Sequence, residues 1–386
     1  VYEVWAANPG FTEPGYSGII VDEFIWRSDA HYRAWGEAVK RIHDTPAFQD
    51  RVFYAWCGDL YEMPAGLEFS RLLMQLGYRF VWERYLPEQP DPEQARQLLY
   101  RDLYVPSQQW QKAMPGIERH MVVCLGYLCA PPESLNLNPG VDYHAFLDMQ
   151  FRMLATDPTF FGLYGIMEYM ASYADEESVR WAHRLFRHYC IEGHRTPLVT
   201  QPYQLSHLKN SDFAEGLEGW EVLPAEDGAV EPAQMEGFSW LQGRYPRTTE
   251  GDTFCLMKRS AKRPNRIRQT IASLEPGRLY SLKLIAAQPN RLHEKDGTEV
   301  RIDVDGVDFL DPYEFQFVYP SCYSHEIGPY TRQNPAYFTL YRLVFRTKGP
   351  TAELTLSDWA EPDTPGGPPG QQTAFNFLEV QPFLEP

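Results

Sequence analysis

The sequence predicts a multidomain protein in which an α/β domain of parallel βα units precedes an all-β sandwich. Between residues 1 and 199, apolar strand-like runs alternate with amphipathic helix-like segments, which is typical of βα units. From residue 200 to 386 the apolar pattern has period two and is interrupted by glycine and proline turns, as in antiparallel sheets. The length of 386 residues fits two domains of about 100 to 200 residues each.

The first half contains five strand-helix units. Strands are expected at 18–24, 51–57, 79–86, 120–128 and 159–169, and helices at 30–42, 66–76, from 92, at 142–155 and at 175–191. The first strand is short, apolar and rich in β-branched residues, which indicates burial on both faces, as parallel sheets require. Right-handed crossovers make such strands neighbours in one sheet.

Five units are fewer than the eight of a closed (β/α)8 barrel, which usually needs about 250 residues. The pattern allows a partial or a complete barrel. We expect the C-terminal part of a barrel, because the opening segment VYEVWAANPGF resembles the end of an earlier helix. The first residue is Val and not Met, so we expect that the start has been removed by processing or truncation. An open doubly wound sheet is the alternative.

The second half, residues 200–386, is expected to form a β-sandwich of the jelly-roll kind. Its strands are predicted at 266–271, 279–286, 299–304, 337–345, 352–356 and 374–380, after a polar linker at 200–207. Two tracts do not follow the period-two pattern and are expected to be long loops, 224–251 and 311–335.

The charge balance restricts the class of partner. The chain has 35 Lys and Arg against 52 Asp and Glu, a formal net charge of −17, which argues against nucleic acid or an anionic membrane as the main partner. No apolar run reaches the length of a membrane span, and no signal peptide is visible. Six cysteines occur without a C-x-x-C pair, and whether they are free thiols or disulfides stays open.

Acidic residues mark the ends of the expected parallel strands, where βα loops converge in barrels and open sheets. Asp22 and Glu23 end the first strand, Glu83 lies in Trp82-Glu83-Arg84-Tyr85, and Glu168 lies in the fifth strand. Because adjacent strand residues point to opposite faces, only one of the first two can face the mouth. Each acid can instead cap a helix or pair with an arginine, as many carboxylates do.

Several motifs of the second half resemble galactose-binding-like jelly-roll carbohydrate-binding modules. They are Asn210-Ser-Asp-Phe213, Gly216–Val222, Ile267–Ile271 with Leu274–Tyr280, and the closing Phe375–Val380. The resemblance implies a carbohydrate partner, core positions for Phe213 and Trp220, and a structural Ca²⁺ near the first and last strands, where Glu379 matches an acidic ligand. We find no full ligand set and expect no other cofactor.

The first half, with its acids and aromatics, resembles the later part of a (β/α)8 glycoside hydrolase. Such enzymes usually need two carboxyl groups. We expect Glu23 and Glu168 as the catalytic pair, with Asp22 and Glu83 as further candidates. Residues beside these acids are expected to bind substrate: Trp26, Asp59, Trp82, Arg84, Tyr85, Tyr127 and Tyr169. The combination implies an extracellular or periplasmic protein.

Other functions remain as alternatives. A non-catalytic carbohydrate-binding or surface-assembly protein is the main one, and a polysaccharide lyase or an esterase is a third. No G-x-S-x-G, Walker A or G-x-G-x-x-G motif is present. His183, His188 and His194 are spaced by five and six residues, which does not place them on one face of a helix, so no metal site is expected.

Overall fold

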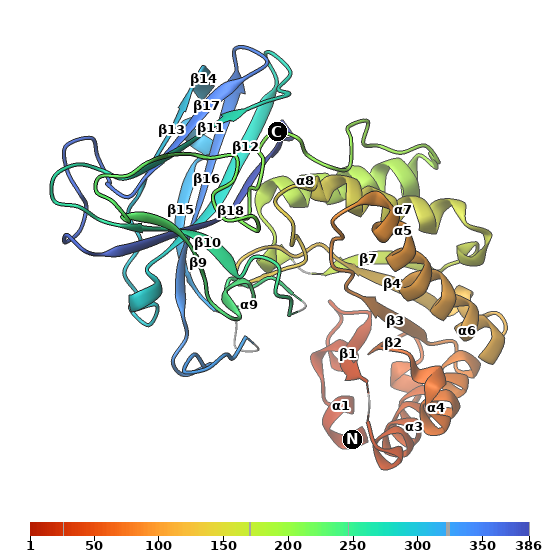
Figure 1. Ribbon diagram of the computed structural model, residues 1–386. Coiled ribbons are helices and arrows are strands. Elements are labelled where there is room, and N and C mark those ends of the chain that lie inside the picture. The colour runs from red at the N-terminus through yellow and green to blue at the C-terminus, as the bar shows by residue number, and fades with distance from the viewer. Residues whose placement is uncertain (26, 170, 246, 322–324, 386) are drawn as a thin grey trace.

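The structure is a computed structural model that describes residues 1–25, 27–169, 171–245, 247–321 and 325–385 (Figure 1). Two units lie side by side: a parallel sheet with its helices, and a set of antiparallel sheets. The expected boundary at residue 199 falls in a stretch, 192–220, that contains no helix or strand. Within the described ranges, every helix is too short or too polar to span a bilayer.

The first unit is built on five parallel strands in the order β1-β2-β3-β4-β7. The strands are β1 (Gly18–Phe24), β2 (Val52–Cys57), β3 (Arg79–Arg84), β4 (Met121–Gly126) and β7 (Gly165–Tyr169). The helices that connect or follow them are α3 (Asp29–Asp44), α4 (Pro64–Gln75), α5 (Pro92–Leu99), α6 (Val105–Ala113), α7 (Tyr143–Thr156) and α8 (Glu176–Leu185).

Spatial order and chain order of these strands are the same, so the crossovers all run in one direction and place the helices on one face (Figure 1). A doubly wound sheet reverses its order and carries helices on both faces, so that alternative is wrong. The barrel is not confirmed either, because β1 and β7 are separate edges of an open sheet in the part of the chain described.

Local sequence explains where the helices begin. Ser28, Asp91, Asp142 and Asp175 each occupy the N-cap position and accept a backbone N–H of the first turn. The fifth strand is shorter than expected. Pro158 starts a 3₁₀ turn, Pro158–Phe160, which Asp157 caps, so this stretch cannot extend the strand.

The two faces of the parallel sheet differ. The helix-covered face holds the main core, with Phe53, Trp82 and Leu125 all fully buried. The opposite face carries a smaller cluster made only of strand residues and residues at strand ends: Tyr54, Trp56, Val81, Tyr85, Val122, Cys124, Met167 and Tyr169. We call it the open face. Side-chain alternation along each strand produces this division.

The second unit is an antiparallel β-sandwich. One sheet has the order β14-β16-β12-β18-β10-β9, with β15 also paired to β16, and the other has the order β13-β17-β11-β8. The strands are β8 (Glu221–Leu223), β9 (Val230–Gln234), β10 (Thr253–Lys258), β11 (Arg266–Ile271), β12 (Leu279–Ala287), β13 (Arg301–Asp305), β14 (Val307–Phe309), β15 (Phe315–Pro320), β16 (Tyr337–Thr347), β17 (Ala352–Ser357) and β18 (Gln372–Pro382). Phe213 and Trp220 are buried in its core, as the resemblance implied.

Two expected loops contain regular structure. Tract 224–251 holds β9 and the short helix α9 (Phe238–Leu241), and tract 311–335 holds β15. Both strands are at the periphery of their sheet, and β9 includes Pro232, which an edge strand tolerates but which lowers the strand signal of the sequence. The described cysteines are free thiols; they are Cys57, Cys124, Cys129, Cys190 and Cys255.

A buried network of charges joins the two units. Asp175, the cap of α8, lies 3.6 Å from Lys283 Nζ on β12 and 3.0 Å from an Arg342 nitrogen on β16. Lys283 Nζ is also 3.4 Å from Glu379 on β18, which accepts a hydrogen bond from Asn136 of the first unit at 2.7 Å. Lys283, Arg342, Glu379 and Asn136 are buried and the Asp175 side chain is 10% exposed, so their pairing orients the sandwich against the sheet.

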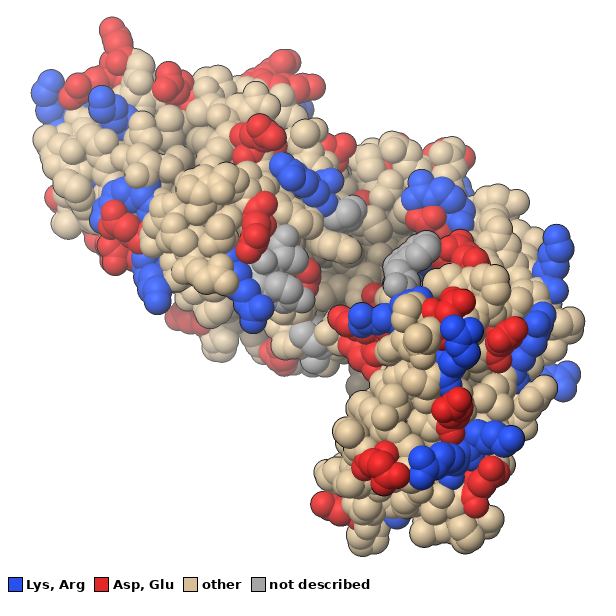
Figure 2. All heavy atoms as spheres, turned by 90° about the horizontal axis from the view of Figure 1, so that it is seen from below, with Lys and Arg blue, Asp and Glu red and all other residues tan. Residues whose placement is uncertain are grey.

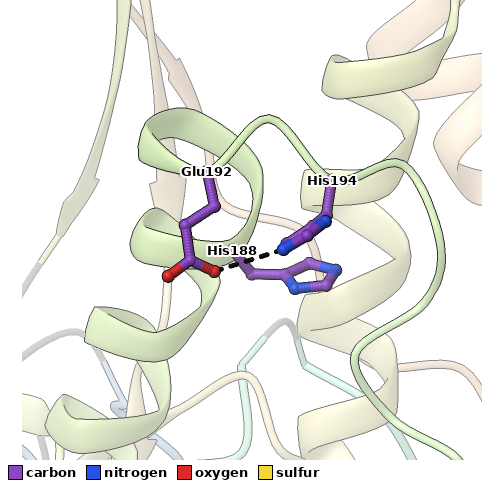
Figure 3. Close-up of side chains that lie close together, drawn as sticks. All are labelled: His188, Glu192 and His194. Atoms are coloured by element: carbon purple, nitrogen blue, oxygen red, sulfur yellow. Dashed lines mark ion pairs between the residues drawn. The ribbon is translucent and has the colours of Figure 1, made fainter.

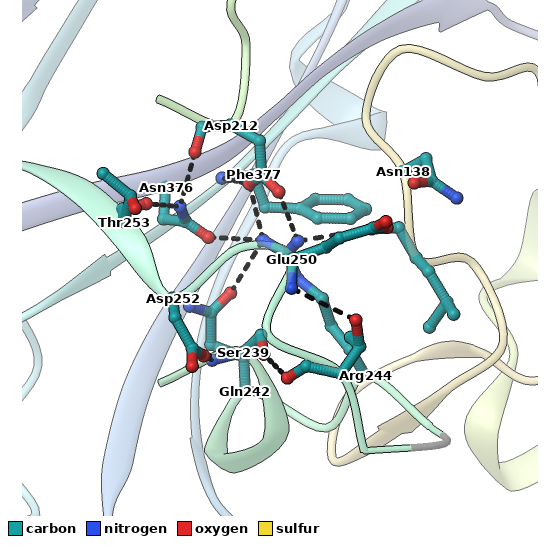
Figure 4. Close-up of polar contacts among 12 residues, drawn as sticks. Asn138, Asp212, Ser239, Gln242, Arg244, Glu250, Asp252, Thr253, Asn376 and Phe377 are labelled. Carbon is teal, nitrogen blue, oxygen red and sulfur yellow. Dashed lines mark hydrogen bonds and ion pairs between the residues drawn. The ribbon is translucent and has the colours of Figure 1, made fainter. Parts of the chain in front are cut away.

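Arg244 forms a second link (Figure 4). Its guanidinium pairs with both oxygens of Asp212, donates to Asn376 and Gln242, and donates to the Leu137 carbonyl of the first unit. These oxygens converge on an arginine, and Glu379 faces a lysine. The residues near the first and last strands therefore do not fit the structural calcium that the resemblance implied, because protein cations already neutralise the oxygens.

Candidate functional site

One carboxylate, Glu83, lies on the open face near the C-terminal end of its strand, within electrostatic reach of Asp22. Glu83 on β3 is in register with Cys124 of the open-face cluster and so projects to that face. On β1, a bulge between Val21 and Phe24 places both of these residues toward the helices. Asp22 lies within that bulge, and its charge acts on Glu83, Tyr85 and Cys124. Asp22 therefore lies within electrostatic reach of Glu83, as Glu23 also does.

The environment of Glu83 favours its protonated form. Burial raises the pKa of Glu83, and the charges of Asp22 and Glu23 add to this effect. The Trp56 indole N–H donates to Glu83 Oε2 at 2.7 Å, which opposes the rise without reversing it. Asp22 is exposed to solvent. A half-buried carboxyl group beside an exposed one is the asymmetry that separates an acid from a base.

Aromatic rings surround these acids. The rings of Tyr85 and Tyr169 are stacked with centroids 5.2 Å apart and planes 8° apart, and Trp56 meets Tyr169 edge-on at 5.5 Å. Burial, followed by the charge of Glu83, raises the pKa of Tyr85. Two residues expected to bind substrate, Tyr85 and Tyr169, thus lie beside the acids.

Three other expected substrate-binding residues point to the opposite side of the sheet. Trp82 is fully buried in the helix-side core, and its indole N–H donates to Asp59 Oδ1 at 2.9 Å. Arg84 pairs with Asp59 and lies over the Trp82 ring at 4.1 Å. Alternation along β3 turns Trp82 and Arg84 away from Glu83, so the trio does not lie on the face that carries Glu83.

The expected pair Glu23 and Glu168 is not brought together. The two residues belong to opposite edge strands, four strand spacings or about 19 Å apart along the sheet. Glu23 has φ 63°, lies in the bulge and pairs with Arg27 in solvent. Glu168 is in register with Leu125 and therefore faces the helices.

Glu168 is nonetheless unusual. Its two carboxylate oxygens are buried and have no hydrogen-bond partner among the described residues. Burial raises the pKa of Glu168 to about 8. It does not cap α8, because Asp175 occupies the cap position. Tyr127, another expected ligand-binding residue, is also buried on the helix side. Trp26 lies outside the described residues.

The sandwich approaches the open face through Tyr245. Burial and the charges of Glu133 and Glu83 raise the pKa of Tyr245, so its ring lies within electrostatic reach of Glu83. The backbone of Tyr245 is fixed by donation to the Ser134 carbonyl at 2.8 Å, and its ring stacks near Trp240 at 5.9 Å. Figure 2 shows a hollow between the two units, with acidic and basic side chains interspersed around it.

Sequence reasoning missed Trp56 and Tyr245. Trp56 had a usable signal, because it shares strand parity with Tyr54, opposite to the buried Phe53 and Ala55. Tyr245 had none, since only the docking of the sandwich brings it near β3.

The sequence matches no protein-family model and no curated protein. Structures similar to part of it include the enzymatically active domain of tailspike protein 4 of bacteriophage CBA120, with 13% identity, a TM-score of 0.27, and coverage of 46% of this chain and 21% of that one. This chain thus spans about a fifth of the tailspike chain.

Two further structures overlap 46% of this chain. TmCBM61, solved in complex with β-1,4-galactotriose, has 13% identity and a TM-score of 0.24 over 97% of its length. A putative sugar binding protein from Bacteroides thetaiotaomicron VPI-5482 has 10% identity and a TM-score of 0.26 over 99% of its length.

Proposed function

We propose that this protein is a glycoside hydrolase acting on a polysaccharide or oligosaccharide, with Glu83 as general acid and Asp22 as the second carboxylate. The observation that carries the proposal is the position of Glu83 on an aromatic-bearing face of a parallel sheet, within electrostatic reach of Asp22 and with its pKa raised by burial. The sandwich serves as an accessory sugar-binding or buttressing unit.

The chemistry follows from the two environments. Glu83, protonated on the oxygen that does not accept from Trp56, donates its proton to the glycosidic oxygen as the bond to the leaving group breaks. The Asp22 carboxylate stabilises the positive charge that develops on the sugar ring, either by attacking the anomeric carbon or by activating a water molecule. The rings of Tyr85 and Tyr169 supply apolar surface against which sugar C–H groups stack.

The test is release of reducing ends from a broad panel of polysaccharides and oligosaccharides. Glu83→Gln should lower kcat at least about 100-fold, the usual contribution of a general acid, and should remove the alkaline limb of the pH profile. Asp22→Asn should lower kcat by a comparable factor. Glu37→Gln is the control, because this exposed carboxylate lies on α3, on the other side of the sheet.

The same assay tests the pair expected from the sequence. Loss of turnover in Glu23→Gln and Glu168→Gln, with Glu83→Gln fully active, would refute the roles of Glu83 and Asp22 and support the pair expected from the sequence. Products lighter than hydrolysis products by one water would identify a lyase.

A non-catalytic carbohydrate-binding protein is the second candidate. It is favoured by the exposure of Asp22 on an edge strand, where water screens its charge. Binding to a glycan array without release of reducing ends, and unchanged by Glu83→Gln, would support this role over catalysis.

A further inference from the structure

A cluster of two histidines and one glutamate lies far from the acids in sequence, at the end of the helix that follows β7. Each of the three residues His188, Glu192 and His194 offers one ligand atom, and these atoms lie within 4.8 Å of one another (Figure 3). His194 Nε2 is 3.3 Å from Glu192 Oε2, and the two imidazole rings are 4.7 Å apart between centroids. His188 projects from the end of the helix, Glu192 from its C-cap position, and His194 from the loop that follows.

The backbone creates this arrangement, which a regular helix would not. After α8 the chain continues as a π-helical segment, Phe186–Ile191, and then reverses at Gly193, whose φ is 70°. The Glu192 N–H donates to the Arg187 carbonyl at 2.9 Å, and the His194 N–H donates to the His188 carbonyl at 3.0 Å. Glycine adopts this left-handed conformation without strain. The chain therefore folds back at Gly193 and places His194 next to His188.

Two hydrogen bonds prepare the side chains as ligands. His188 Nε2 lies 2.8 Å from the Thr196 carbonyl oxygen. A carbonyl can only accept, so Nε2 carries a proton, and in a neutral imidazole Nδ1 is then the nitrogen with the free lone pair. Histidines that bind metals usually donate their second N–H in this way. Arg187 Nε donates to Glu192 Oε1 at 2.7 Å, which leaves Oε2 on the side of His194.

We propose that His188, Glu192 and His194 form a binding site for a divalent transition-metal ion of the zinc type. Two imidazole nitrogens and one carboxylate oxygen suit Zn²⁺, Ni²⁺ or Cu²⁺ and not Ca²⁺ or Mg²⁺, which prefer oxygen ligands alone. Ligand atoms about 2.05 Å from a tetrahedral ion are about 3.3 Å apart. Small side-chain rotations would therefore bring the three ligand atoms to binding distance of one ion. Because Glu192 and His194 are exposed, the fourth position opens to solvent.

The proposal concerns a site separate from the open face and independent of the proposed hydrolysis. It also answers the sequence argument against a metal site, which was that the histidines do not share one face of a helix. Spacings of five and six residues fail on a continuous α-helix, but the π-helical segment and the turn at Gly193 bring His188 and His194 together.

Isothermal titration of tag-free, chelator-treated protein with ZnCl₂ tests the site. We expect one ion per chain, and at least about a tenfold loss of affinity in His188→Ala and in His194→Ala. Glu192→Gln should weaken binding less, because the amide keeps one oxygen. Co²⁺ should give the intense visible absorption of a tetrahedral complex, and His188→Ala should abolish it.

Two controls locate the binding. His183→Ala removes an exposed histidine of the same helix outside the cluster, and Cys190→Ser removes the exposed thiol two residues from His188. Both should bind Zn²⁺ with the affinity of the parent protein. Absence of stoichiometric binding would overturn the proposal, and so would parent-like affinity in His188→Ala and His194→Ala or loss of binding in either control.

Discussion

Lys283 is the residue whose removal should most directly test how the two units are held together. Its ammonium group lies 3.4 Å from Glu379 and 3.6 Å from Asp175, and Glu379 is fully buried. Against the effect of burial, the charges of Asp175 and Glu379 raise the pKa of Lys283 above its ordinary range. In Lys283→Met, Asp175 keeps Arg342 at 3.0 Å, whereas Glu379 keeps only the amide of Asn136.

Leaving one buried charge without its partner costs about 3 to 5 kcal/mol. Because Asp175 remains paired, we expect the free energy of unfolding to fall by about 3 kcal/mol in Lys283→Met at pH 7. The loss should be smaller at pH 5. Burial raises the pKa of Glu379 in the folded state. As the pH falls, the folded variant therefore binds a proton at Glu379 before the unfolded chain does, and this proton removes the unpaired buried charge.

Urea unfolding, followed by circular dichroism and tryptophan fluorescence at both pH values, measures this loss. The double variant Lys283→Met, Glu379→Gln replaces the charge pair by neutral groups and should recover to within about 1 kcal/mol of the parent. A loss below about 1 kcal/mol in the single variant, or a double variant no more stable than the single one, would refute this account of the interface.

Two further predictions concern stability. Since burial raises the pKa of Glu168 from 4.5 to about 8, the folded state holds a proton that the unfolded chain releases in this window. The free energy of unfolding should therefore fall as pH rises from 4.5 to 8, by up to about 1.4 kcal/mol per unit, and Glu168→Gln should remove this component in pH-dependent urea titrations; an equal slope in the variant would contradict it. Gly243 has φ 92°, and a Cβ there would lie 2.1 Å from the Pro132 carbonyl oxygen, so Gly243→Ala should cost more than about 2 kcal/mol by thermal unfolding. Gly228→Ala, at φ 72° with no atom within 4 Å, should cost only about 1 to 2 kcal/mol, and equal losses would show that the contact is unimportant.

Much of the architecture could be read from the sequence because it depends on local patterning. Strand β11 was expected with its observed limits, and the capping residue Ser28 preceded a helix whose apolar face repeated at helical spacing. Strands β8, β9, β10, β14 and β15 were not predicted. Pro232 obscures the period-two pattern of β9 and a Tyr-rich neighbourhood obscures that of β15, and each forms by pairing with a neighbouring strand.

The site was predicted only in part. The position of acids at strand ends follows from the chain, but the face that each acid occupies depends on strand parity and register. Glu83 shares the open face with Cys124, whereas Glu168, also near a strand end, is in register with Leu125 and faces the helices. After Val21, the bulge in β1 changes which side chains face the helices, and no sequence pattern predicted this bulge.

By itself the sequence determined the succession of parallel units and antiparallel strands, because period and capping act over a few residues. Tertiary structure alone decided which carboxylates meet, which charges are buried between the units, and that His188 and His194 come together. Those outcomes depend on register, on a π-helical segment and on contacts between residues distant in the chain. A side chain's partner is set by these long-range geometries, whereas its local conformation is set largely by its neighbours.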